Sequence, residues 1–187
     1  SALGANGLAA QAFLNTITAP AAAGIAWAIG EKITRGHASA LGFVSGAVAG
    51  LVAITPAAGF AGTFGSIVLG AVAGFACLWA VVSLKPALKY DDSLDVFGIH
   101  GVGGIVGAIG TAIVAAPSLG GFGAEDYAMG GQLVTQVLAV VVAIVWSAVV
   151  TVVAMLIVKA LFGGARVSEA SESDGLDLTT HGERAYN

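Results

Sequence analysis

Long stretches without charge divide the chain into segments of membrane-crossing length. Asp, Glu, Lys and Arg are absent from residues 1–30, 38–84, 96–124 and 127–158. The hydrocarbon core of a bilayer is about 30 Å thick, and a helix needs about 20 apolar residues to cross it. The second stretch is long enough for two helices, and Pro56 and Gly59 provide a break inside it.

This pattern predicts an all-α polytopic membrane protein with five transmembrane helices. A five-stranded barrel would leave open edges, which lipid does not tolerate. The expected helices are about 4–30, 38–54, 61–84, 95–115 and 130–162. Together they form a membrane domain over residues 1–162. Residues 163–187 are rich in acidic side chains, so we expect a cytoplasmic C-terminal tail there.

Composition agrees with this prediction and excludes some functions. Hydrophobic residues make up 57% of the chain and charged residues 10%, whereas soluble domains carry about a quarter charged residues. The net charge of -4 argues against a nucleic-acid-binding protein, which needs basic side chains to neutralise phosphates. Cys77 is the single cysteine, so the chain has no internal disulfide.

The basic residues predict an orientation in the cell membrane. They lie after the first and third expected helices and at or beyond the end of the fifth: Lys32, Arg35, Lys85, Lys89, Lys159, Arg166 and Arg184. The connections at 55–60 and 116–129 contain neither Lys nor Arg. Because basic residues are enriched in cytoplasmic loops, we expect the N-terminus outside and the C-terminus in the cytoplasm.

Small and polar residues suggest where the helices pack. The string GAVAG occurs at 46–50 and again at 70–74, which gives two pairs of glycines the spacing of close helix contacts. The expected first helix is locally polar, with Asn6, Gln11, Asn15, Thr16 and Thr18. This polarity fits both interhelical hydrogen bonds and a pore wall.

His100 is the main candidate for a functional side chain, because ionisable groups at membrane depth are costly and usually functional. On a regular helix it shares one stripe with Val96, Gly103, Gly104, Gly107 and Thr111, so a helix or a small solute can approach the imidazole. Desolvation disfavours the charged ring, so we expect a neutral imidazole that can accept and donate a proton. A buried histidine bound to a neighbouring carbonyl is the alternative.

Other chemistry is sparse in this sequence. Asp91, Asp92 and Asp95 precede the His100 helix, where carboxylates cap free N–H groups, so we expect structural roles for them. The sequence lacks a phosphate-binding loop, a metal-spaced cluster and a nucleophile–base pair. We therefore expect neither an enzyme nor a bound metal or cofactor.

Three segments resemble the ammonium transporter family of bacteria and archaea, which is related to the Rh proteins. They are GLVAITPAAGF at 50–60, DDSLDVFGIHGVGG at 91–104 and GLDLTTHGERAYN at 175–187. The resemblance implies eleven-helix subunits in a homotrimer, each with its own pore and built from two inverted repeats plus a last helix. It implies that this chain is a fragment corresponding to the last five helices.

The resemblance also implies roles for individual residues. His100 matches the second member of a pore histidine pair, whose partner belongs to the absent fifth helix. Ser1 matches a serine that helps to recruit ammonium at the outer vestibule, and Val48 and Val96 match apolar pore-lining positions. Asp92 matches a structural aspartate of the other repeat.

The function implied by the resemblance is the transport of ammonium or ammonia across the cell membrane. The tail resembles a segment that contacts the neighbouring subunit and couples the trimer to a cytoplasmic PII signalling protein. One alternative is a membrane sensor that binds ammonium and a cytoplasmic partner without conducting. A nonconducting fragment is the other, since five helices do not enclose the family's pore by themselves.

Overall fold

The computed structural model describes residues 4–183, and every regular element within that range is a helix. The long helices are α1 (Gly7–Arg35), α2 (Ala40–Ile54), α3 (Thr63–Trp79), α5 (Val102–Val114) and α6 (Met129–Phe162). The helix of α3 continues through the π-helical turn η1 (Ala80–Leu84) into α4 (Lys85–Leu88). The π-helical turn η2 (Phe97–Gly101) leads into α5. Shorter elements are η3 (Pro117–Leu119), α7 (Glu169–Asp174) and η4 (Asp177–His181).

The prediction of an all-α polytopic membrane protein is confirmed. Four helical runs in the described part of the chain are long and apolar enough to cross a membrane: Gly7–Arg35, Thr63–Leu88, Phe97–Val114 and Met129–Phe162. The remaining expected span, α2, is apolar but has only 15 residues. Beyond Ile54 the chain continues as turns.

Two helices extend past their predicted ends at residues 30 and 84. The first ends at Arg35 and the third continues to Leu88, so Lys32, Arg35 and Lys85 belong to helices. Basic side chains in a last turn complement the helix dipole, and their long stems reach water from within the apolar region. A boundary drawn at the first charge therefore ends these helices too early.

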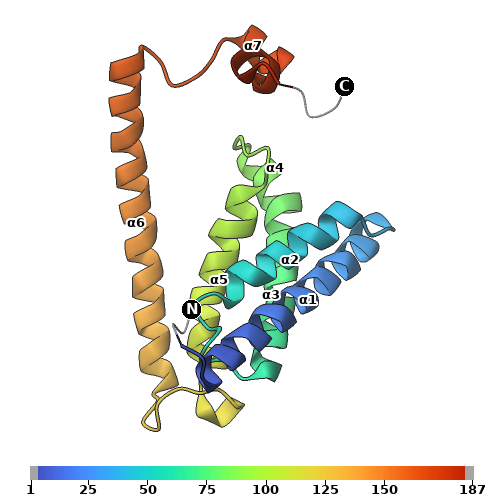
Figure 1. Ribbon diagram of the computed structural model, residues 1–187, viewed down its shortest axis with the longest axis vertical. Helices are drawn as coiled ribbons and strands as arrows, with labels where there is room; N and C mark the ends of the chain where they lie inside the picture. The colour runs from blue at the N-terminus through green and yellow to red at the C-terminus, as the bar shows by residue number, and fades with distance from the viewer. Residues whose placement is uncertain (1–3, 184–187) are drawn as a thin grey trace. The chain divides into compact units, whose positions relative to one another are not determined.

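Residues up to Val140 form one compact unit, in which α1 packs on α2 and α3, and α5 packs on the same two helices (Figure 1). Both GAVAG strings contact α1. A Cβ atom on Gly50 would lie 2.6 Å from the Cα of Pro20, and one on Gly70 would lie 2.2 Å from the carbonyl oxygen of Ala19. The packing role predicted for these glycines is confirmed, because only a missing side chain permits such an approach.

The polar side chains of α1 mainly form hydrogen bonds to neighbouring segments of this unit. Asn15 is fully buried, and its Nδ2 donates to the carbonyl oxygens of Ala58 and Ala61 at 2.8 and 2.7 Å. The hydroxyls of Thr18 and Ser66 lie 2.7 Å apart and join α1 to α3. Interhelical hydrogen bonding, one of the two interpretations left open by the sequence, accounts for Thr18, whereas Asn15 binds the connection between α2 and α3.

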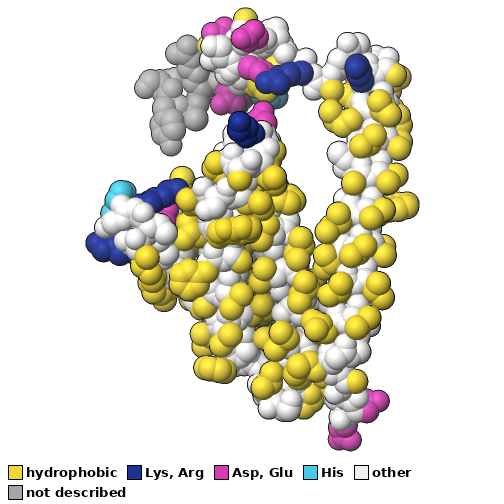
Figure 2. Space-filling model, turned by 180° about the vertical axis from the view of Figure 1, so that it is seen from behind, with side chains coloured by type: hydrophobic (Ala, Val, Ile, Leu, Met, Phe, Trp, Pro, Cys, Tyr) yellow, Lys and Arg dark blue, Asp and Glu magenta, His cyan; other side chains and the backbone are white. Residues whose placement is uncertain are grey.

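The outer surface of the helices is apolar. In Figure 2 hydrophobic side chains cover the flanks of the helices, and Lys and Arg side chains gather at helix ends. Exposed apolar side chains occur along α1, α2, α3 and α5, including Ile25, Leu51 and Val72. Such a surface suits contact with lipid or with other membrane helices.

Residues from Val141 onward form a second compact unit, which contains the rest of α6 and the polar tail. Ser168 caps α7 by accepting a hydrogen bond from the backbone N–H of Ser171. Arg166 donates to the Glu172 carboxylate at 2.8 Å, and this hydrogen bond lowers the pKa of Glu172.

Candidate functional site

The candidate site is built on η2, the π-helical turn that contains His100. A π-turn carries one extra residue relative to an α-helix, and such turns occur frequently at functional sites. Here the backbone N–H of Val102 donates to the carbonyl of Phe97, five residues earlier. The turn joins the polar connection after α4 to the apolar helix α5.

Asp92 holds the beginning of this turn. One of its carboxylate oxygens accepts a hydrogen bond from the N–H of Val96 at 2.9 Å, and the other accepts from Phe97 at 2.8 Å. These N–H groups lie in the first turn of the helix, where they have no partner within the helix. Asp92 thus makes the capping contacts that its position suggested.

Asp95 has a different partner from the one its position suggested. Its carboxylate accepts a hydrogen bond from the Lys85 ammonium at 2.7 Å, and its carbonyl accepts from the N–H of Ile99 at 2.9 Å. The prediction that its side chain caps the helix is therefore wrong. The backbone of Asp95 has a φ of 56°, in the left-handed region that residues with a Cβ seldom adopt.

The back of η2 is fixed against the end of α3. A Cβ atom on Gly98 would lie 2.8 Å from Cγ2 of Val81 in η1, so the two π-turns meet at a residue without a side chain. The buried Cys77 thiol donates to the carbonyl of Ile99 at 3.7 Å. These contacts anchor the face of the turn that points into the unit.

His100 lies on the other face and is exposed. Within residues 4–183 its ring makes no hydrogen bond, so these residues supply no carbonyl partner of the kind that the structural alternative requires. Val96 is 50% exposed. Val48 of α2 is half-buried and packs against a cluster that includes Trp27, Cys77 and Ile99, so it lies close to the turn.

The π-turn also divides the predicted stripe of residues. An extra residue rotates the following helix by about 100° relative to a regular α-helix. Gly103 contacts α2 and α3, Gly107 contacts α2, and Thr111 is buried, whereas a Cβ atom on Gly104 would meet none of the described residues within 4 Å. Within this unit Gly104 therefore does not pack closely against another helix, and the space beside its Cα is open.

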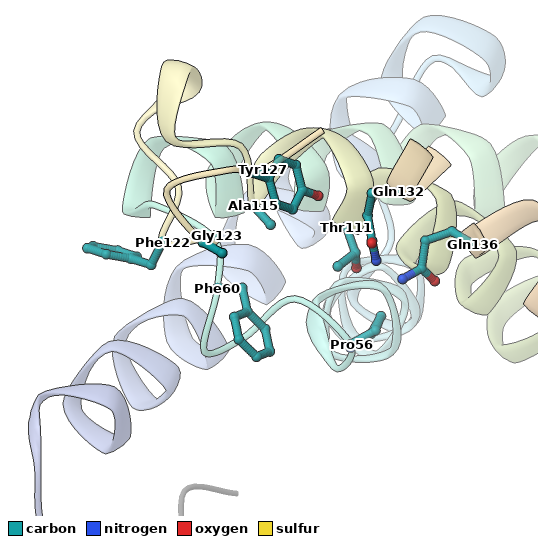
Figure 3. A pocket seen from close by; sticks show the side chains of 10 residues that line it. Pro56, Phe60, Thr111, Ala115, Phe122, Gly123, Tyr127, Gln132 and Gln136 are labelled. Atoms are coloured by element: carbon teal, nitrogen blue, oxygen red, sulfur yellow. The ribbon is translucent and has the colours of Figure 1, made fainter. Parts of the chain in front are cut away.

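A separate cavity of about 260 Å³ lies near the other end of α5 (Figure 3). Its lining includes Phe60, Thr111, Tyr127, Gln132 and Gln136. The Tyr127 hydroxyl donates to the carbonyl of Ala112 at 2.9 Å, and burial raises the pKa of this phenol. The lining carries no charged side chain and no histidine, so the cavity differs in chemistry from the face that carries His100.

Sequence reasoning missed Lys85 and Gly98 as parts of this site. In the sequence Lys85 stands out only as a charge that indicates topology, because its contact with Asp95 spans a turn that has no helical period. Ser1 lies outside the described residues. No group of three His, Cys, Asp or Glu side chains that could hold a metal occurs among residues 4–183.

Apolar helices packed through glycines, with an exposed imidazole on the fourth expected span, define a polytopic helical membrane protein. The chain belongs to the ammonium transporter family, because the model described as Ammonium Transporter Family matches residues 1–186. This match covers the segments at 50–60 and 91–104 and all but the last residue of the segment at 175–187.

Relatives that match the whole chain include two bacterial ammonium transporters. An ammonium transporter of Aquifex aeolicus (strain VF5) is 48% identical over 187 residues, which are 44% of its length. An ammonium transporter of Bacillus subtilis (strain 168) is 49% identical over 189 residues, or 46% of its length. The chain therefore spans less than half the length of these curated relatives.

Solved structures share the fold. The crystal structure of Candida albicans Mep2 aligns with a TM-score of 0.78 at 32% identity, covering 90% of this chain and 38% of that protein. A structure named Sensor Amt Protein aligns with a TM-score of 0.84 at 30% identity, covering 94% of this chain and 43% of its own. Both likenesses extend over nearly all of the described helices.

Proposed function

We propose that this chain supplies one wall of a path for ammonium transport across the cell membrane, with His100 as its proton-handling group. The observation that supports this most directly is the exposed imidazole on an otherwise apolar helix, next to the open space at Gly104. An ionisable side chain at membrane depth is costly, and such side chains are therefore rare and usually functional. Val96 and Val48 provide the apolar surface beside it, and Asp92 and Asp95 hold the helix that carries it.

Charge explains why a histidine is suited to this path. Moving a bare ammonium ion into an apolar bore costs on the order of tens of kcal/mol in a Born estimate. Loss of a proton removes that cost, and neutral ammonia can then cross an apolar surface. A neutral imidazole both accepts and donates a proton, so His100, paired with a histidine from another part of the protein, gives the proton its own route. Potassium has no proton to lose and is rejected.

The remaining expectations complete the proposal. Ser1 helps to recruit ammonium at the outer end, where cation–π and hydroxyl contacts stabilise the ion. The N-terminal end of the chain faces outward and the tail faces the cytoplasm, in agreement with the Lys and Arg residues at the ends of α1, α4 and α6 and in the tail. The protein assembles as a homotrimer of subunits with separate paths, and the tail contacts a PII signalling protein.

Ammonium-induced current in proteoliposomes containing the intact protein tests the role of His100. We expect His100→Ala to lower the current about a hundredfold, because general acid–base groups typically contribute two to four orders of magnitude. His37→Ala is the matched control. His37 is also exposed, but it lies in the connection after α1, directly after the C-cap residue Gly36. We expect the control to conduct like the unmodified protein.

Two results would count against the proposal. Equal currents from His100→Ala and His37→Ala would remove His100 from the path. An absence of current in the unmodified protein, together with ammonium-dependent binding of a cytoplasmic partner to the tail, would favour the sensor alternative.

A further inference from the structure

The connection between α4 and η2 contains two residues with left-handed backbone conformations. Lys89 has a φ of 53° and ends α4, and Asp95 has a φ of 56° and directly precedes the helix that carries His100. Residues with a Cβ atom adopt this conformation at a cost in free energy, so the surrounding structure must hold it. Only Asp95 has a dedicated partner for its side chain among the described residues.

Lys85 is that partner, and it contacts both sides of the turn. Its ammonium donates to the Asp95 carboxylate at 2.7 Å and to the carbonyl oxygen of Asp92. The Lys85 and Asp95 side chains are 27% and 31% exposed, so water screens the pair only in part. The same Asp92 carbonyl also accepts the N–H of Asp95 at 3.3 Å. Lys85 therefore fixes the turn from Asp92 to Asp95.

The turn determines how η2 begins. With Asp95 in this conformation its carbonyl accepts the N–H of Ile99, and the Asp92 carboxylate accepts the N–H groups of Val96 and Phe97. The π-turn follows at once. A shift of this start by one residue would rotate the next side chains by about 100°. His100 would then turn away from the open face at Gly104.

We infer that Lys85 is a positioning residue for His100, because its contacts with Asp92 and Asp95 hold the turn that sets the direction of the imidazole. The expected effect of Lys85 on transport rests on the proposed function of His100. The claim that Lys85 positions the His100 ring does not depend on transport. In the ordinary alternative, Lys85 serves only as a cytoplasmic charge that fixes topology.

The experiment compares variants of the intact protein in proteoliposomes and nanodiscs. We expect Lys85→Met to lower ammonium-induced current about tenfold, since small displacements of a positioned group have effects of this size or larger. Lys89→Met is the matched control, because it removes a lysine from the same end of the same helix. If Lys85 acts only through its charge on topology, the two variants behave alike, and the inference is overturned.

A rescue separates the backbone argument from a simple loss of charge pairing. Lys85→Met combined with Asp95→Gly removes the unpaired carboxylate and the strain of the left-handed conformation, since glycine adopts it freely. Lys85→Met combined with Asp95→Ala removes the carboxylate but keeps the Cβ atom. We expect the glycine double variant to regain most of the current and the alanine double variant to remain low. Equal rescue by both would overturn the inference.

Two readouts do not require conduction. Lys85→Met should speed hydrogen exchange at the amides of residues 96–102 and shift the ring NMR signals of labelled His100, and the glycine double variant should reverse both changes. Unchanged exchange and ring signals in Lys85→Met would overturn the inference even if current falls. If the unmodified protein fails to conduct, these signals still test the positioning, so the two proposals can fail separately.

Discussion

The two faces of the run from Phe97 to Val114 differ in how much room surrounds the backbone. On the inner face a Cβ atom on Gly107 would lie 2.3 Å from the carbonyl oxygen of Ala53, and one on Gly103 would lie 3.2 Å from the Cys77 sulfur. On the outer face Gly104 has open space, and His100 is exposed. The same residue type therefore serves close packing on one side and leaves space beside an imidazole on the other.

The comparison shows that glycine content alone does not reveal a transport path. Small residues allow helices to approach, and that is their commonest role between membrane helices. The two roles meet at the π-turn here, since Gly103 and Gly107 beyond it contact neighbouring helices while His100 within it is exposed. Variants at the glycines of each face can test this division.

The largest contrast is expected between Gly107→Leu and Gly104→Leu. Leucine at 107 would collide with the backbone of α2, and overpacking that cannot relax costs about 3 kcal/mol or more. We expect this variant to lose the folded, assembled protein in detergent. Leucine at 104 should leave assembly intact but lower ammonium current, because it fills the space beside His100. Size-exclusion chromatography and current measurements on the same preparations provide the data.

Equal loss of assembly in both variants would mean that another part of the intact protein packs tightly on Gly104, and the outer face would then not border an open path. Normal assembly of Gly107→Leu would instead contradict the close approach of α5 and α2.

A smaller effect is expected at the contact between the two π-turns. Alanine at Gly98 would place a Cβ atom 2.8 Å from the side chain of Val81, and this end of a side chain can move, so we expect a loss of about 1–2 kcal/mol. The additional change Val81→Ala should restore most of the loss. Thermal unfolding of the single and double variants in detergent measures both. Additive losses would show that the two residues do not share the contact.

Much of the fold could be predicted from the sequence, because its causes are local and repetitive. Uncharged stretches of the required length indicate the spans, and the two GAVAG strings indicate helix contacts that the structure confirms against α1. The helix ends were predicted less accurately, since Lys32, Arg35 and Lys85 belong to helices. A charged residue near a helix end is stabilised by the dipole and by water, and composition does not separate it from a loop residue.

The candidate site was predictable in part. His100 is conspicuous because it is a single ionisable residue in an apolar helix. The direction of the His100 side chain was not predictable, since a regular α-helical period puts His100 on one stripe with Gly103 and Gly107. The π-turn is accompanied by contacts between residues that are not three or four positions apart, such as Lys85 with Asp95 and Gly98 with Val81. The helical periodicity of apolar and polar residues does not indicate such contacts.

The smallest expected effect concerns Gly103, where the inner face is close but not closed. A Cβ atom there would lie 3.2 Å from the Cys77 sulfur and 3.4 Å from Cγ1 of Val52, so a shift of a few tenths of an ångström accommodates it. We expect Gly103→Ala to cost about 0.5–1 kcal/mol, less than Gly98→Ala.

In a Cys77→Ala background the added methyl group occupies the volume left by the sulfur, so the substitution should become neutral or favourable. A double-mutant cycle from thermal unfolding of the intact protein measures this coupling, since residues in contact depart from additivity by about 0.5 kcal/mol or more. Strict additivity would place Gly103 away from Cys77 and turn α5 from the orientation that leaves His100 on the open face.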